Sequence, residues 1–131
     1  MTRSSPLKES VARQIALLRA GEPLQAFDAF YAPHVVMYSN DVLFASTAAE
    51  ARAKQVPFIT AATSISGRIV DVTLDEKSNI CVFRNLTTFT DATGAEHQID
   101  GLCRQHWQDG LIVEERYYDG AHAKRERENI A

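Results

Sequence analysis

The sequence predicts an α+β domain in which three N-terminal helices pack on a mostly antiparallel sheet. Apolar residues recur at helical spacing in the first half of the 131-residue chain, and from Ser64 onward they alternate with polar residues at a period of two. Segregated helices and strands are typical of α+β domains, because helices can cover one face of an antiparallel sheet. The length suits a single domain over residues 1–131.

The first half of the chain carries the start and stop signals of three helices. Gly21 suits the end of the first helix, whose apolar face is formed by Leu7, Val11, Ile15 and Leu18. Pro23 suits the first turn of a second, short helix, and Pro33 ends it. The segment Thr47–Glu50 has the spacing of a capping box and opens a third helix. We expect Pro57 to kink or end this third helix early.

The strands are expected in a short pair followed by a long meander. His34–Ser39 reads as the first strand and Val42–Phe44 as its short partner. The meander is predicted from four segments that turn residues separate, namely Ile69–Leu74, Ile80–Thr90, Ala95–Trp107 and Leu111–Tyr118. Residues 1–6 and 121–131 are predicted to be flexible tails, and the second stretch, rich in Lys, Arg and Glu, fits either a solvated tail or a solvated helix.

Composition excludes several classes of function. A net charge of -3 provides no basic field for a phosphate backbone or an anionic membrane, so neither nucleic acid nor membrane is the expected partner. The absence of a secretory or long apolar stretch favours a cytoplasmic protein, in which Cys81 and Cys103 are expected to be free thiols. The four histidines lack ligand spacing and no glycine-rich phosphate loop is present, so we expect no metal and no cofactor.

Two segments and the order of the elements point to a known superfamily. Phe30–Val36 and Trp107–Asp119, with the helix-helix-strand-helix-meander order, resemble the nuclear-transport-factor-2-like (SnoaL-like) superfamily over nearly the whole chain. The resemblance implies a strongly curved sheet that forms a cone with an internal pocket. That superfamily includes isomerases, epoxide hydrolases, dehydratases, polyketide cyclases and non-catalytic binders, so the fold alone does not select an activity.

Within the superfamily, the residue pattern resembles limonene-epoxide-hydrolase-like enzymes. Tyr38 and Asn40 reproduce a Tyr-x-Asn element, Arg84 supplies an arginine, and Asp119 supplies a closing aspartate. The resemblance implies that these four residues are catalytic, with Asp119 as base or water activator, Tyr38 and Asn40 as orienting groups and Arg84 as charge stabiliser. Leu86 departs from the pattern, because it stands where those enzymes have the acid that protonates the epoxide oxygen.

Side-chain alternation, counted from an inward Arg84, predicts which residues line the pocket. The expected substrate-binding residues are Tyr117, Glu115, Trp107, Leu86, Cys103 and Phe58. Each candidate also has a structural interpretation: an Arg84–Asp119 ion pair that ties two strands together, Tyr38 as a core aromatic, Asn40 in a turn, and Cys103 as a small buried hydrophobe.

Three functions are compatible with these residues, and the sequence leaves the choice among them open. The first is a cofactor-independent enzyme that performs general acid–base chemistry (hydrolysis, isomerisation, dehydration or cyclisation) on a small hydrophobic molecule. Glu115 or Tyr117 is then a possible replacement for the missing acid. The second is a non-catalytic binder of an apolar ligand, and the third is a dimeric accessory domain. A homodimer contact is predicted on the outer sheet face, through Phe89, Leu102 and Tyr118.

Overall fold

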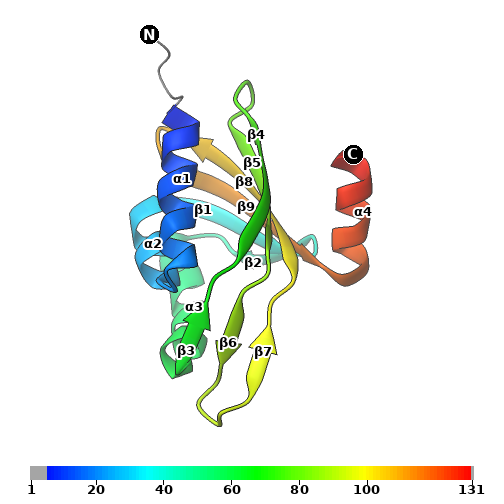
Figure 1. The fold of residues 1–131 in the computed structure, drawn as a ribbon. Coiled ribbons are helices and arrows are strands. Elements are labelled where there is room, and N and C mark those ends of the chain that lie inside the picture. Colours follow the sequence, from blue (N-terminus) through cyan, green and yellow to red (C-terminus); the bar gives the residue numbers. More distant parts are fainter. Residues whose placement is uncertain (1–5, 131) are drawn as a thin grey trace.

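The computed structural model describes residues 6–130 as four helices and nine strands (Figure 1). The helices are α1 (Pro6–Arg19), α2 (Pro23–Phe30), α3 (Ala48–Ala61) and α4 (Gly120–Ile130). The strands are β1 (Tyr31–Ser39), β2 (Val42–Ala45), β3 (Ser64–Ser66), β4 (Ile69–Asp75), β5 (Ile80–Asn85), β6 (Thr88–Thr90), β7 (Glu96–Gln98), β8 (Gly101–Gln108) and β9 (Leu111–Asp119). The α+β prediction is confirmed.

The strands form a large mixed sheet and a small antiparallel one. The large sheet has the order β2-β1-β9-β8-β5-β4, in which β1 and β9 are parallel and the other neighbours are antiparallel. The small sheet has the order β3-β6-β7. In Figure 1 the helices α1, α2 and α3 lie on one side of the large sheet, and α4 lies on the other.

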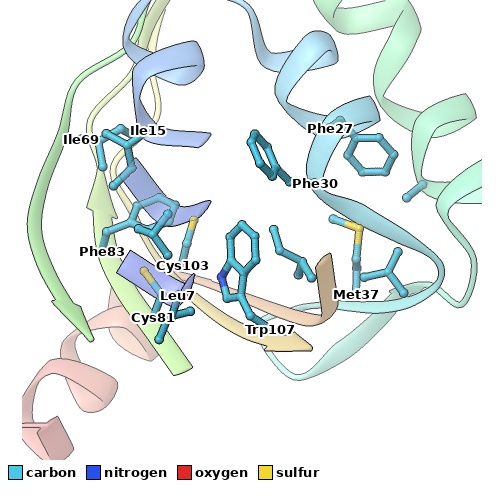
Figure 2. Close-up of a cluster of buried hydrophobic side chains, with 14 of the residues drawn as sticks. Leu7, Ile15, Phe27, Phe30, Met37, Ile69, Cys81, Phe83, Cys103 and Trp107 are labelled. Atoms are coloured by element: carbon cyan, nitrogen blue, oxygen red, sulfur yellow. The ribbon is translucent and has the colours of Figure 1, made fainter. Parts of the chain in front are cut away.

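The core lies between the large sheet and the N-terminal helices. Figure 2 shows Phe83, Cys103 and Trp107 of the sheet facing side chains of α1 and α2, among them Ile15 and Phe30. The Phe30 and Trp107 rings pack at 5.9 Å between centroids. The apolar face predicted for the first helix is confirmed at Leu7, Val11 and Ile15, which are buried.

Three local signals in the sequence act as expected. Gly21 has a positive φ of 75° and follows α1, and the next amide, that of Glu22, bonds the Leu17 carbonyl at 3.0 Å. At the start of α3 the Thr47 hydroxyl accepts from the amide of Glu50 at 3.1 Å. The β1–β2 hairpin turns at Asn40 and Asp41, which both have positive φ.

The predicted element boundaries are wrong at four places. α3 runs through Pro57, and β1 begins at Tyr31, before Pro33. The two longest predicted strands are each broken, at residues 86–87 and 99–100, because the chain leaves the large sheet there and pairs within the small one. The Leu86 amide bonds the Arg68 carbonyl at 2.7 Å, and the Ile99 amide bonds the Thr87 carbonyl at 2.7 Å.

Of the two forms expected for the C-terminal segment, the structure shows the helix, over Gly120–Ile130. α4 places Ala123 in a second, small core with Leu102 and Tyr118 of the outer sheet face. Both of those residues are therefore covered within the chain, although they were expected at a dimer contact. Whether the protein dimerises stays a prediction. Of the other expected tail, residues 1–5 lie outside the described residues, and Pro6 begins α1.

Candidate functional site

A cavity of about 420 Å³ lies between the N-terminal helices and the small sheet. This volume is in the range of small-molecule binding sites. Most of the side chains that line it are apolar. They come from the first half of the chain (Gln14, Leu18, Pro23, Ala26, Phe27, Tyr31, Phe44, Lys54, Gln55, Phe58, Ile59, Ala62) and from the later strands and the breaks between them (Ile65, Asn85, Thr87, Phe89, Ile99).

The cavity has an exposed rim and a buried end. Phe58 and Lys54 are exposed, and Phe58 keeps 76% of its surface accessible although it is a large apolar residue. The Lys54 ammonium donates to the Phe44 carbonyl and lies 5.1 Å from the centroid of the Phe44 ring. Gln14 of α1, by contrast, is 1% exposed, and its Oε1 has no hydrogen-bond partner among the described residues.

A partly buried hydrogen-bond network adjoins the cavity through Tyr31. The Tyr31 ring stacks on Phe27, with 4.3 Å between centroids, and its hydroxyl donates to Oε2 of Glu115. Gln105 Nε2 donates to the same carboxylate oxygen at 2.7 Å, and Trp107 Nε1 donates to Gln105 Oε1 at 3.2 Å. This chain of contacts links a residue of the cavity wall to a carboxyl group in the interior.

Burial controls the protonation of this network. It raises the pKa of the Glu115 carboxyl above its ordinary value of 4.5, while the hydrogen bonds from Tyr31 and Gln105 oppose that shift. Burial and the nearby Glu115 charge raise the pKa of the Tyr31 phenol well above its ordinary value. A carboxyl group with a raised pKa that is hydrogen-bonded to a residue of the cavity wall is suited to taking up and releasing a proton.

The four residues expected to be catalytic do not line this cavity. Asn40 and Asp119 do meet: Asn40 Nδ2 donates to Asp119 Oδ1 at 2.8 Å, and the Asp119 amide donates to Asn40 Oδ1 at 3.0 Å. Their contact ties the β1–β2 turn to the end of β9. Tyr38 lies under the Arg116 guanidinium, with 4.1 Å from Cζ to the ring centroid. A catalytic role for any of these residues stays a prediction.

The orientation predicted for Arg84 is wrong. Arg84 pairs in the sheet with Leu102 on the outer face, and its guanidinium bonds Asp100 at 3.0 Å through both Nε and Nη2, so no Arg84–Asp119 pair forms. The reason is that Phe83 occupies the inward position of β5 and is 1% exposed. The same alternation places Asn85 on the cavity side of β5, and Thr87 and Phe89 line the cavity as well. Whether Phe89 takes part in a dimer contact stays a prediction.

Of the six residues expected to bind substrate, one lines the cavity. Phe58 lines the cavity, and Leu86 is not among its lining residues. Trp107 and Cys103 are core residues, while Glu115 and Tyr117 are partly buried. Tyr117 packs on Gly101 so closely that a Cβ there would stand 2.1 Å from its ring. Burial raises the pKa of the Cys103 thiol, and the structure shows Cys81 and Cys103 free, as expected.

Three residues of this site were not predicted from the sequence: Gln14, Tyr31 and Lys54. One of them had a detectable signal, since Gln14 stands seven residues after Leu7 and interrupts the apolar face of α1. Residues 6–130 contain no group of three or more His, Cys, Asp or Glu side chains that could hold a metal. No helix in that range is long and apolar enough to span a membrane.

Solved structures share this architecture. A candidate SnoaL-like polyketide cyclase from Mesorhizobium loti is 18% identical, with a TM-score of 0.71 over 91% of this chain and 100% of that one. AclR, a candidate hydroxylase from Streptomyces galilaeus, is 16% identical, with a TM-score of 0.71 over 95% and 96% of the two chains. An NTF2-like protein of unknown function from Burkholderia pseudomallei is 15% identical, with a TM-score of 0.68 over 95% and 97%.

The protein therefore has the NTF2-like, SnoaL-like fold that the resemblance implied. At these identities the likeness concerns the fold and not the activity. The sequence matches no protein-family model, and no curated protein matches it.

Proposed function

We propose that this protein binds a small, mostly apolar organic molecule in the cavity and exchanges a proton with it through Tyr31 and Glu115. The observation that carries the proposal is the hydrogen bond from Tyr31, a residue of the cavity wall, to the Glu115 carboxyl. A proton leaving a C–H or O–H bond of the ligand passes to the phenolic oxygen while the phenolic proton passes to Glu115. The ligand keeps the electron pair and the phenol stays neutral.

The surroundings of Glu115 suit this role. Gln105 holds the carboxylate by a 2.7 Å hydrogen bond, and Trp107 fixes Gln105 in turn. Such secondary contacts restrict the carboxylate to one orientation, as a general base requires. The chemistry open to the pair is acid–base chemistry: isomerisation, dehydration, cyclisation or hydrolysis, without a cofactor. The solved polyketide cyclase and hydroxylase candidates with this fold are consistent with a small-molecule enzyme.

A direct test is exchange of carbon-bound hydrogen for deuterium. The probe is 2-tetralone, a small apolar ketone whose α-hydrogens are acidic. Its exchange in D₂O is followed as the loss of the α-hydrogen signals by NMR, and the rate in buffer alone is subtracted. We expect Glu115→Gln to lower the protein-catalysed rate by about a hundredfold or more, the usual size of a general-base effect. Tyr31→Phe should lower it as well, because the relay loses its hydroxyl.

Glu114→Gln is the matched control. Glu114 is the next residue on β9, but its carboxylate lies outside the network and bonds Arg116 Nε at 3.0 Å. This variant should exchange like wild type. Equal rates for wild type and Glu115→Gln would contradict the proposed chemistry.

A non-catalytic binder is the second candidate. The observation that favours it is that Tyr31 and Gln105 both donate to Oε2 of Glu115, so this oxygen is satisfied without a ligand. In that case wild type would bind the ketone, and neither wild type nor any of the three variants would accelerate exchange above the buffer rate.

A further inference from the structure

The cavity has one fixed charge on its rim. Lys54 is the one charged side chain among the described lining residues, and no carboxylate lines the cavity to neutralise it. The ammonium is anchored at the rim, because it donates to the Phe44 carbonyl and lies over the Phe44 ring. The side chain is nevertheless exposed, so its remaining N–H groups can meet a ligand. An anionic group of a ligand would find its complement here.

The buried end of the cavity has an unmet polar atom. Gln14 lies on α1 within the apolar face that packs on the sheet, and its Oε1 is buried without a partner among residues 6–130. A buried carbonyl oxygen without a donor is unfavourable, and natural proteins contain few of them. Because Gln14 also lines the cavity, a hydroxyl on the ligand can supply the missing donor.

We propose that the ligand is an elongated hydroxy acid with an apolar ring body, a carboxylate at Lys54 and a hydroxyl at Gln14. This inference rests on the proposed function, in that it requires the ligand to occupy the same cavity. The apolar body contacts the aromatic and aliphatic wall between the two polar groups, which Phe27, Phe58 and Ile59 help to form. The exposed Phe58 ring at the rim is covered when the ligand is bound.

Three related probes separate the two polar contacts. 6-Hydroxy-2-naphthoate carries both groups at opposite ends of one ring system, 2-naphthoate lacks the hydroxyl, and methyl 6-hydroxy-2-naphthoate lacks the negative charge. We expect wild type, in isothermal titration calorimetry, to bind the hydroxy acid about twofold to fivefold more tightly than the ester, the usual effect of an exposed ion pair. We expect it to bind the hydroxy acid about tenfold more tightly than 2-naphthoate, because a buried acceptor is satisfied.

Two substitutions assign these preferences to residues. Lys54→Gln should abolish the preference for the acid over the ester and keep the preference for the hydroxyl. Gln14→Met, which preserves the volume of the side chain, should abolish the preference for the hydroxyl alone. Lys124→Gln is the matched control, because Lys124 is exposed on α4 at the other face of the sheet and should leave both preferences unchanged.

A blocked cavity distinguishes failure of this inference from failure of the proposed function. Ala62→Phe adds a ring at a lining position and should weaken all three probes. If Ala62→Phe weakens them but wild type does not discriminate among them, the hydroxy-acid assignment is overturned and the cavity remains the binding site. If wild type binds the probes and Ala62→Phe does not weaken that binding, the probes bind outside the cavity. This result overturns both the hydroxy-acid assignment and the proposed function. No binding of any probe overturns the hydroxy-acid assignment.

Discussion

Two buried glutamines should respond to the same substitution in opposite directions. Gln14 and Gln105 are each 1% exposed, and methionine has nearly the same length and volume as glutamine. Gln14 Oε1 has no partner among the described residues, so Gln14→Met removes a polar group whose burial costs about 1–3 kcal/mol. Gln105 instead donates to Glu115 at 2.7 Å and accepts from Trp107 at 3.2 Å, so Gln105→Met leaves the Trp107 N–H without an acceptor and removes one of the two donors to Glu115 Oε2. We expect Gln105→Met to lower the free energy of unfolding by about 2–5 kcal/mol.

Thermal and urea unfolding of the two variants and wild type measure this difference. For a domain of 131 residues, 1 kcal/mol moves Tm by about 3–5 °C, so Gln14→Met should melt several degrees higher and Gln105→Met many degrees lower. The midpoint in urea should change in the same directions at an unchanged m value. A lower Tm for Gln14→Met would refute the reasoning, because it would mean that the Gln14 amide is satisfied in the folded protein.

Three further predictions concern groups at and around the site. The pKa of Glu115 is raised in the folded state, so between pH 4.5 and that raised pKa the folded state binds more protons than the unfolded state. The free energy of unfolding should therefore fall as pH rises through this window. Tm measured from pH 4 to pH 8 should show this fall in wild type and not in Glu115→Gln. The side chains of Arg84 and Asp100 are 34% and 48% exposed, so Arg84→Met should lower the free energy of unfolding in urea by less than about 1 kcal/mol. It should leave 2-tetralone exchange unchanged, and a loss of exchange would restore the catalytic prediction for Arg84. Asp119→Ala removes the side-chain contact with Asn40 and should lower Tm by a few degrees without slowing exchange, and a large loss of exchange would show that the base is Asp119 and not Glu115.

The parts of the fold that could be predicted depend on local chemistry. Gly21 ends α1 because its positive φ is accessible to glycine, and Thr47 starts α3 because its hydroxyl satisfies an amide three residues later. The alternation of β8 and β9 was also predicted correctly for Cys103 and Glu115, whose side chains lie on the core side of the sheet. In each case the cause lies within a few residues of the effect.

The errors arose where a distant contact decides the outcome. Arg84 and Phe83 are neighbours in β5, so only one of their side chains can face the core. The inward prediction for Arg84 came from the resemblance to an arginine-containing active site. In the structure the apolar Phe83 side chain is the one that is buried. Sequence alternation alone fits either choice, since Cys81 and Val82 are both apolar. The ion pair with Asp100, sixteen residues away, then stabilises the outward position of Arg84.

The cavity itself depends on the same kind of distant contact. If residues 80–90 and 95–107 formed two continuous strands, the small sheet would not exist. Ile65 and Phe89, which lie on that sheet, would then not line the cavity. The breaks at Leu86 and Ile99 are held by single backbone hydrogen bonds to Arg68 and Thr87, and neither break carries a proline or glycine that would mark it in the sequence. The large sheet thus carries the hydrogen-bonded Glu115 carboxyl, and the small sheet supplies part of the cavity wall. The candidate site lies where the two meet, which explains why strand patterns predicted the first component and not the second.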